Sequence, residues 1–234
     1  MTIVCPLQYF GLGDIIFTQT LIKEICAKED RILWGVYRDF VEGLNRAYPE
    51  VMFVPYDTIK IDYEKKEDQI SNWVRTVPIR WSDSILGVTY NDHMKSKYML
   101  YNLDFKEWTK HAKYIRNRER EEKLLDLVVG RNIGFRPYNL VNETFNTTLD
   151  GHRQIKLNNS LANIYLTKIN GYSLFDWSLI IEQAVEVHTV STSLFYLLEL
   201  LELDQPLHLY ARPNDPGFDH ISYLFTKPYI LHSS

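Results

Sequence analysis

The chain has 234 residues, and its 45% hydrophobic and 14% aromatic content is sufficient for a packed core, which excludes a disordered protein. A formal net charge of -4 and a pI near 6.0 argue against a dedicated nucleic-acid binder, because neutralising phosphates requires a basic surface. The first residues do not form a signal-peptide pattern and no apolar run reaches membrane-spanning length, so we expect a cytoplasmic protein with no transmembrane segment.

The beginning of the chain alternates between strand and helix patterns. An apolar segment, 2–10, runs into the glycine pair Gly11 and Gly13 and then into an amphipathic helix pattern. The next predicted elements are a strand at 31–37, a helix at 39–48 and a strand at 51–55. This β-α-β-α-β order predicts a parallel, doubly wound sheet.

A long helix is predicted in the middle of the chain, after extended pieces at 77–80 and 84–88. Asp104 is suited to cap this helix, which continues to about Val129. Four apolar residues fall on one face of it, namely Phe105, Trp108, Ala112 and Ile115. The segment 130–137 combines glycines with a proline, and it predicts a boundary between an N-terminal domain, 1–130, and a C-terminal domain, 137–234.

The second half of the chain also alternates strands with helices. Strands at 138–145 and 152–157 are predicted to form a hairpin through the Asp150-Gly151 pair. The remaining predicted elements are strands at 163–167, 185–190, 206–211 and 229–232 and helices at 174–184 and 194–201. The fold class is therefore predicted to be α/β, with two Rossmann-like halves.

The turn Gly11-Leu-Gly13-Asp14 follows a predicted strand, at the edge where α/β proteins bind ligands. A dinucleotide fingerprint requires a third small residue, and Ile16 stands at that position. A P-loop is excluded because no Gly-Lys-Ser/Thr follows. Asp14 has two interpretations, an N-cap of the helix or a carboxylate that faces a ligand.

A second turn of this kind is formed by Ser191, Thr192 and Ser193, between a predicted strand and an apolar helix. Free backbone N–H groups, hydroxyls and the helix dipole together suit a diphosphate group. The alternative interpretation is an ordinary serine N-cap without a ligand.

Together, the stretches 11–21 and 181–197 resemble the heptosyltransferase-like glycosyltransferases of the GT-B fold. That family opens with a strand, a Gly-Asp turn and a helix, and near its end it has a helix, a strand and a Ser/Thr-containing turn. The resemblance implies two Rossmann-like domains facing across a cleft, with the acceptor on the N-terminal side and the donor on the C-terminal side. It also implies transfer of a sugar from a nucleotide-sugar donor to a hydroxyl of a glycan or other acceptor.

The resemblance implies roles for particular residues. Asp14 matches the acidic general base of the family, and residues 191–193 match the turn that binds the diphosphate of the donor. Because the sequence contains no Asp-x-Asp and no metal-ligand spacing, we expect a metal-independent enzyme without a cofactor. Other candidates follow predicted strands, namely Lys168 and Arg212 for the donor, and Gly11, Gly13 and Arg38 for the acceptor-side loop.

Four other polar side chains are interpreted as structural. His188 lies inside a predicted strand and reads as a hydrogen-bonded core residue. Glu182 and Glu186 are interpreted as solvated or capping residues rather than ribose ligands, and His93 as a loop residue without chemistry.

Two other functions remain open at this point. A nucleotide- or sugar-binding module that has lost catalysis is one, since Ser193 and Tyr196 stand where the family has Gly and His. A nicotinamide-dependent oxidoreductase is the other; it rests on Gly11 and Gly13 alone, and Ile16 counts against it.

Overall fold

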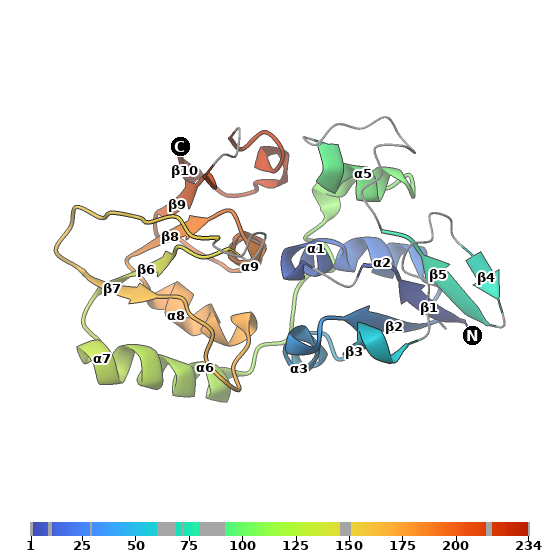
Figure 1. Cartoon of the computed structure of the whole chain (residues 1–234), viewed down its shortest axis with the longest axis horizontal. Helices are drawn as coiled ribbons and strands as arrows, with labels where there is room; N and C mark the ends of the chain where they lie inside the picture. Colours follow the sequence, from blue (N-terminus) through green and yellow to red (C-terminus); the bar gives the residue numbers. More distant parts are fainter. Residues whose placement is uncertain are drawn as a thin grey trace. The chain divides into compact units, whose positions relative to one another are not determined.

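A computed structural model describes residues 2–8, 11–28, 30–59, 69–71, 73–79, 92–145, 151–213 and 217–233. The chain forms two compact units, Met1–Ile115 and Arg116–Ser234 (Figure 1). The predicted extended piece at 84–88 and the hairpin turn residue Asp150 lie outside the described residues. No helix in the described ranges has both the length and the apolar character needed to cross a membrane.

Unit 1 is built on a five-stranded sheet of order β3-β2-β1-β5-β4, in which β4 is antiparallel to β5 and the other pairs are parallel. Its strands are β1 (Ile3–Pro6), β2 (Arg31–Val36), β3 (Val51–Pro55), β4 (Gln69–Ser71) and β5 (Val74–Val77). Its helices are α1 (Leu12–Phe17), α2 (Gln19–Ile25), α3 (Arg38–Ala47) and α5 (His93–Met99), with 3-10 turns η1 (Tyr56–Thr58) and η3 (Phe105–Glu107). The predicted β-α-β-α-β order of this unit is confirmed.

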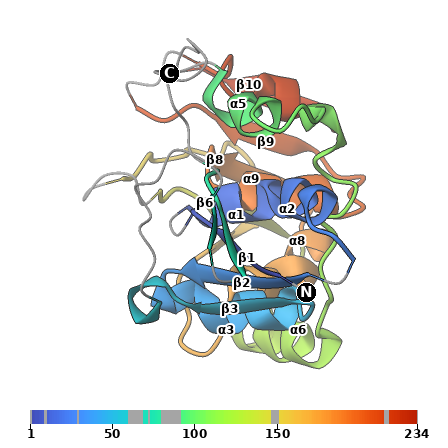
Figure 2. The ribbon, with the colours of Figure 1, turned by 90° about the vertical axis from the view of Figure 1, so that its right-hand side faces the viewer.

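Side-chain bonds to the backbone join the layers of unit 1. The amide of Asn45, on α3, bonds both the carbonyl and the N–H of Phe53 at 2.8 and 2.9 Å, so α3 lies along the edge strand β3 (Figure 2). The buried ring of Trp34 stacks on Phe53, and its Nε1 donates to the Gln8 carbonyl at 2.6 Å. These contacts fix the carboxyl ends of β1 and β2 next to each other.

The prediction of a helix from Asp104 to about Val129 is wrong over its first half. Asp104 caps only the 3-10 turn η3, and Ile115, predicted on the buried face, is 62% exposed. Trp108 and Ala112 are buried as predicted, although turns rather than a helix carry them. The hydroxyl of Thr20, on α2, donates to the Trp108 carbonyl and holds these turns against the unit.

Unit 2 is built on a five-stranded sheet of order β10-β9-β8-β6-β7, in which all pairs are parallel. Its strands are β6 (Tyr138–Asn142), β7 (Ala162–Tyr165), β8 (Glu186–Val190), β9 (Leu207–Tyr210) and β10 (Tyr229–His232). Its helices are α6 (Arg118–Leu125), the π-turn η4 (Asp126–Gly130), α7 (Arg131–Ile133), α8 (Ser178–Gln183) and α9 (Ser193–Leu200), with 3-10 turns η5 (Leu174–Trp177) and η6 (Ser222–Leu224).

The two faces of the unit 2 sheet are covered differently. On one face, the Tyr138 hydroxyl donates to the Ile180 carbonyl of α8, and Tyr229 contacts Phe195 of α9. On the other face, Phe145 and Ile155 from the segment 143–157 pack on Val141 and Val190. Within its described residues, that segment forms no helix, and the strand predicted at 152–157 is reduced to a bridge between Thr144 and His152.

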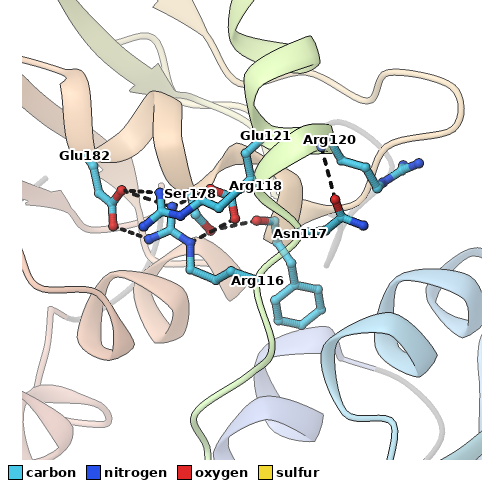
Figure 3. A network of polar contacts seen from close by, with 8 residues as sticks. Arg116, Asn117, Arg118, Arg120, Glu121, Ser178 and Glu182 are labelled. Atoms are coloured by element: carbon cyan, nitrogen blue, oxygen red, sulfur yellow. Dashed lines mark hydrogen bonds and ion pairs between the residues drawn. The ribbon is translucent and has the colours of Figure 1, made fainter.

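The division between the units falls after Ile115, before the helix α6, whereas the sequence predicted a boundary at 130–137. Charged side chains explain why α6 belongs to unit 2 (Figure 3). Arg116 donates to both Glu121, at 2.8 Å, and Glu182 of α8, at 3.0 Å. Burial disfavours the charge of Glu182, but the bonds from Arg116 and Arg118 outweigh this effect and lower the pKa of the carboxyl.

Glu121→Gln tests whether this network stabilises unit 2. The Glu121 side chain is only 1% exposed, so loss of its charge weakens buried bonds to Arg116, whose guanidinium keeps Glu182 as its anionic partner. We expect the free energy of unfolding to fall by about 2 kcal/mol in urea titrations. Glu119→Gln on the same helix is the control, because Glu119 pairs with Lys123 in solvent and its loss is expected to have no measurable effect. Equal changes in the two variants would contradict this account.

Candidate functional site

The turn after β1 is built around Gly11, which caps α1 with a left-handed backbone of φ 75°. A Cβ atom added to Gly11 would collide with the Asp14 carboxylate. Glycine is therefore required here both by the backbone and by the space that the carboxylate occupies. Asp14 is the third residue of α1 and makes no side-chain cap, so its interpretation as the N-cap is wrong. Gly13 is buried in the same helical turn.

Asp14 forms an ion pair with Lys97, which lies on α5. The Lys97 side chain is 4% exposed and that of Asp14 is 28% exposed, so the cation is buried and the carboxylate reaches solvent. Tyr98 holds α5 in place by donating from its hydroxyl to the Phe17 carbonyl of α1 at 2.7 Å. Lys97 was not predicted from the sequence. The signal in the sequence was a lysine between Met94 and Tyr98, two large side chains that the structure buries.

Arg38 begins α3 directly after β2, at the same edge of the sheet as the turn after β1. It is exposed and pairs with Asp57 at 3.3 Å rather than with Asp14. Beside it, the half-exposed ring of Tyr37 contacts the rings of Phe40 and Tyr56, with centroids 6.1 and 5.5 Å apart. This aromatic group, which the sequence did not suggest, follows the carboxyl ends of β2 and β3.

The turn 191–193 connects β8 to α9 in unit 2. Thr192 is the N-cap of α9, and its Oγ1 accepts from the backbone N–H of Leu194 at 3.3 Å. Asn142, the last residue of β6, donates to the same Oγ1 at 3.0 Å and to Thr189 at 2.9 Å. Sequence reasoning missed Asn142, although a polar residue ending an apolar strand was a visible signal. Ser191 is buried and Ser193 opens the helix.

Arg212 lies close to this turn. It follows β9, the neighbour of β8, and its Nε donates to the Ser191 carbonyl at 2.7 Å. Its guanidinium also lies over the Phe145 ring, 5.1 Å from the ring centre. The structure therefore unites Arg212 with the turn 191–193. Lys168 follows β7, which pairs with β6 and not with β8 or β9.

The unit 2 group has the chemistry of an anion site. The first turn of the eight-residue helix α9 directs backbone N–H groups toward the edge at which β6, β8 and β9 end. A guanidinium at the same edge adds a fixed positive charge, and arginine is well suited to phosphate oxygens. A phosphate or diphosphate is the ligand that this combination favours.

The four residues interpreted as structural have mixed outcomes. His188 is buried and bonded to Glu186 and Tyr210, as predicted for a hydrogen-bonded core residue. Glu182 belongs to the ion-pair network with Arg116. His93 is not a loop residue, because it begins α5.

Comparisons with solved structures identify the fold. The chain is similar to the glycosyl transferase family 9 protein from Veillonella parvula, with a TM-score of 0.57 and 8% identity, covering 99% of this chain and 86% of that one. It is also similar to TibC, an iron-containing dodecameric glycosyltransferase from enterotoxigenic E. coli, with a TM-score of 0.54 and 10% identity over 93% of this chain and 58% of TibC. For the E. coli ADP-heptose LPS heptosyltransferase II the TM-score is 0.50 and the identity 11%, over 100% of this chain and 90% of that one.

These similarities confirm the predicted fold class, two α/β units with largely parallel sheets as in GT-B glycosyltransferases. At such low identity they concern the fold alone. The sequence matches no family model and no curated protein.

Gly11→Ala tests the construction of the turn after β1. The added methyl group meets both an unfavourable backbone and the Asp14 carboxylate, so we expect the free energy of unfolding to fall by about 2 kcal/mol or more. Gly134→Ala is the matched control, because Gly134 also has a positive φ, of 62°, but no atom within 4 Å of the added Cβ. Urea titrations that show the same loss for both variants would contradict the collision with Asp14.

Proposed function

We propose that the chain is a metal-independent glycosyltransferase that transfers a sugar from a nucleotide-sugar donor to a hydroxyl acceptor. The observation that carries the proposal is the convergence of Arg212 with the turn 191–193, in a chain with the fold of nucleotide-sugar-dependent glycosyltransferases. One structure of TibC is a complex with ADP-D-β-D-heptose, which favours a nucleotide sugar as the donor here.

Unit 2 is proposed to bind the donor. When the bond between the sugar and the diphosphate breaks, negative charge develops on the leaving phosphate oxygens. The N–H groups at the start of α9 and the Arg212 guanidinium are fixed before the reaction, so they stabilise this charge without reorganising. The sequence has no Asp-x-Asp to hold a metal ion on the diphosphate, which favours this metal-free mode of stabilisation.

Unit 1 is proposed to bind the acceptor. The Asp14 carboxylate accepts the proton of the acceptor hydroxyl. At the same time, the oxygen of that hydroxyl attacks the anomeric carbon of the donor. Lys97 is a positioning residue in this proposal, since its buried ammonium holds the partly exposed carboxylate in one orientation. Arg38 and the Tyr37 ring lie at the same edge of the sheet and suit the hydroxyls and apolar face of a sugar acceptor.

Asp14→Asn is expected to abolish transfer while leaving donor binding intact, because an amide keeps the shape of the carboxylate but does not accept the proton. The assay is release of nucleotide from ADP-, UDP-, GDP- and CMP-sugars with candidate acceptors, and we expect a loss of at least about 100-fold. The thermal shift caused by the matching nucleotide is expected to stay as in wild type.

Asp104→Asn is the control, because Asp104 caps the turn η3 and asparagine also serves as a cap. Transfer by Asp14→Asn at the wild-type rate would refute the assignment of the base. A wild-type protein that binds a nucleotide but releases none from any donor would favour the non-catalytic binding module, which the Ser193 and Tyr196 replacements also favour.

A further inference from the structure

Three imidazoles and a carboxylate gather on the face of the unit 2 sheet that the segment 143–157 partly covers. We propose that Glu186, His188 and His208 on this face form a binding site for a divalent transition-metal ion of the Zn²⁺ class. The site is independent of the proposed function and involves none of the residues assigned to it.

The register of the sheet brings these side chains together. His188 of β8 is paired with His208 of β9, and Tyr210 of β9 is paired with His232 of β10. Glu186 lies two residues before His188, so it projects from the same face of β8. The rings of His188 and His208 stack with their centres 4.3 Å apart.

The donor atoms are close enough for one ion. One ligand atom from each of Glu186, His188 and His208 lies within 4.8 Å of the others. Ligands in a tetrahedral zinc site are about 3.4 Å apart, given metal–ligand distances of about 2.1 Å. Glu186 and His208 are partly exposed, so small rotations of these two side chains close the difference, while water completes the coordination.

The surroundings resemble the outer shell of a metal site. His188 Nε2 lies 3.0 Å from the Glu186 carboxylate, and its Nδ1 lies 3.2 Å from the Tyr210 hydroxyl. An ionised carboxylate only accepts hydrogen bonds, so Nε2 carries the ring proton in this arrangement. When Nε2 binds an ion, the proton moves to Nδ1 and is donated to the Tyr210 oxygen, and the ring stays neutral. His232 holds His208 in the same way, with their ring nitrogens 3.0 Å apart.

The chemistry of the three ligands also suits a transition-metal ion. Two neutral imidazoles and one carboxylate prefer Zn²⁺ and its neighbours in the transition series over Mg²⁺ or Ca²⁺, which take oxygen ligands. No spacing in the sequence indicates such a site, because the ligands come from two strands that only the sheet register joins.

The test is calorimetric titration of the untagged, metal-free full chain with ZnCl₂, together with a thermal shift. We expect one ion per chain and a rise in melting temperature. His208→Gln and Glu186→Gln, which change partly exposed side chains and leave the buried His188 intact, are each expected to raise the Kd about tenfold or more.

His152→Gln is the matched control. His152 also lies beside a carboxylate, with Nε2 3.3 Å from Glu143, but it belongs to no such cluster among the described residues. We expect this variant to bind Zn²⁺ as wild type does. Wild-type affinity in His208→Gln and Glu186→Gln, or a loss in His152→Gln equal to theirs, would overturn the proposal. No saturable binding by the wild-type chain would also overturn it.

Discussion

Parallel pairing of β6, β8 and β9 brings the carboxyl ends of three strands to one edge of the unit 2 sheet, and the candidate donor site depends on this pairing. Asn142, the turn 191–193 and Arg212 each follow one of these strands. Each residue is far from the others in sequence, and each becomes a neighbour only because the strands run in the same direction. The same register places His188 beside His208 on one face of this sheet.

In unit 1, the turn at Gly11 and the buried Lys97 together position the Asp14 carboxylate at the corresponding edge of the sheet. Gly11 allows the chain to turn sharply, and the absence of a side chain leaves room for the Asp14 carboxylate. The buried Lys97 then pairs with that carboxylate from a different helix. A carboxylate held by an ammonium loses less conformational freedom when a ligand arrives, which is the preorganisation that proton transfer requires. The exposed fraction of Asp14 leaves it accessible to the acceptor that we propose.

Much of the fold was predictable because it depends on local patterns. Apolar strands, Pro49 and the small polar turns mark the alternation of strands and helices, and β2, β3, α3, β8 and α9 lie where the sequence predicts them. The stretch from Asp104 to Ile115 was misassigned because spaced apolar residues fit a helix, whereas turns bury Trp108 and Ala112 equally well. The domain boundary was misplaced because the Arg116–Glu182 pair, which ties α6 to α8, joins residues distant in sequence.

The candidate site was predictable in part, because residues in local strand-to-helix turns leave a pattern in the sequence and contacts between distant residues do not. Asp14 and the turn 191–193 each follow a strand and open a helix, so sequence alone pointed to them. Lys97 was missed because its partner lies 83 residues away. Lys168 and Arg212 have the same sequence signal, a cation after a strand, and only the strand order separates them.

In the proposed mechanism, the turn 191–193, and not the turn at Gly11, binds the diphosphate of a donor. Amide hydrogen exchange of the full chain, with and without a saturating nucleoside diphosphate, tests it most directly, because bound phosphate protects the amides it contacts. We expect slower exchange at residues 191–194 and unchanged exchange at residues 11–15. Protection at residues 11–15 without protection at 191–194 would contradict it.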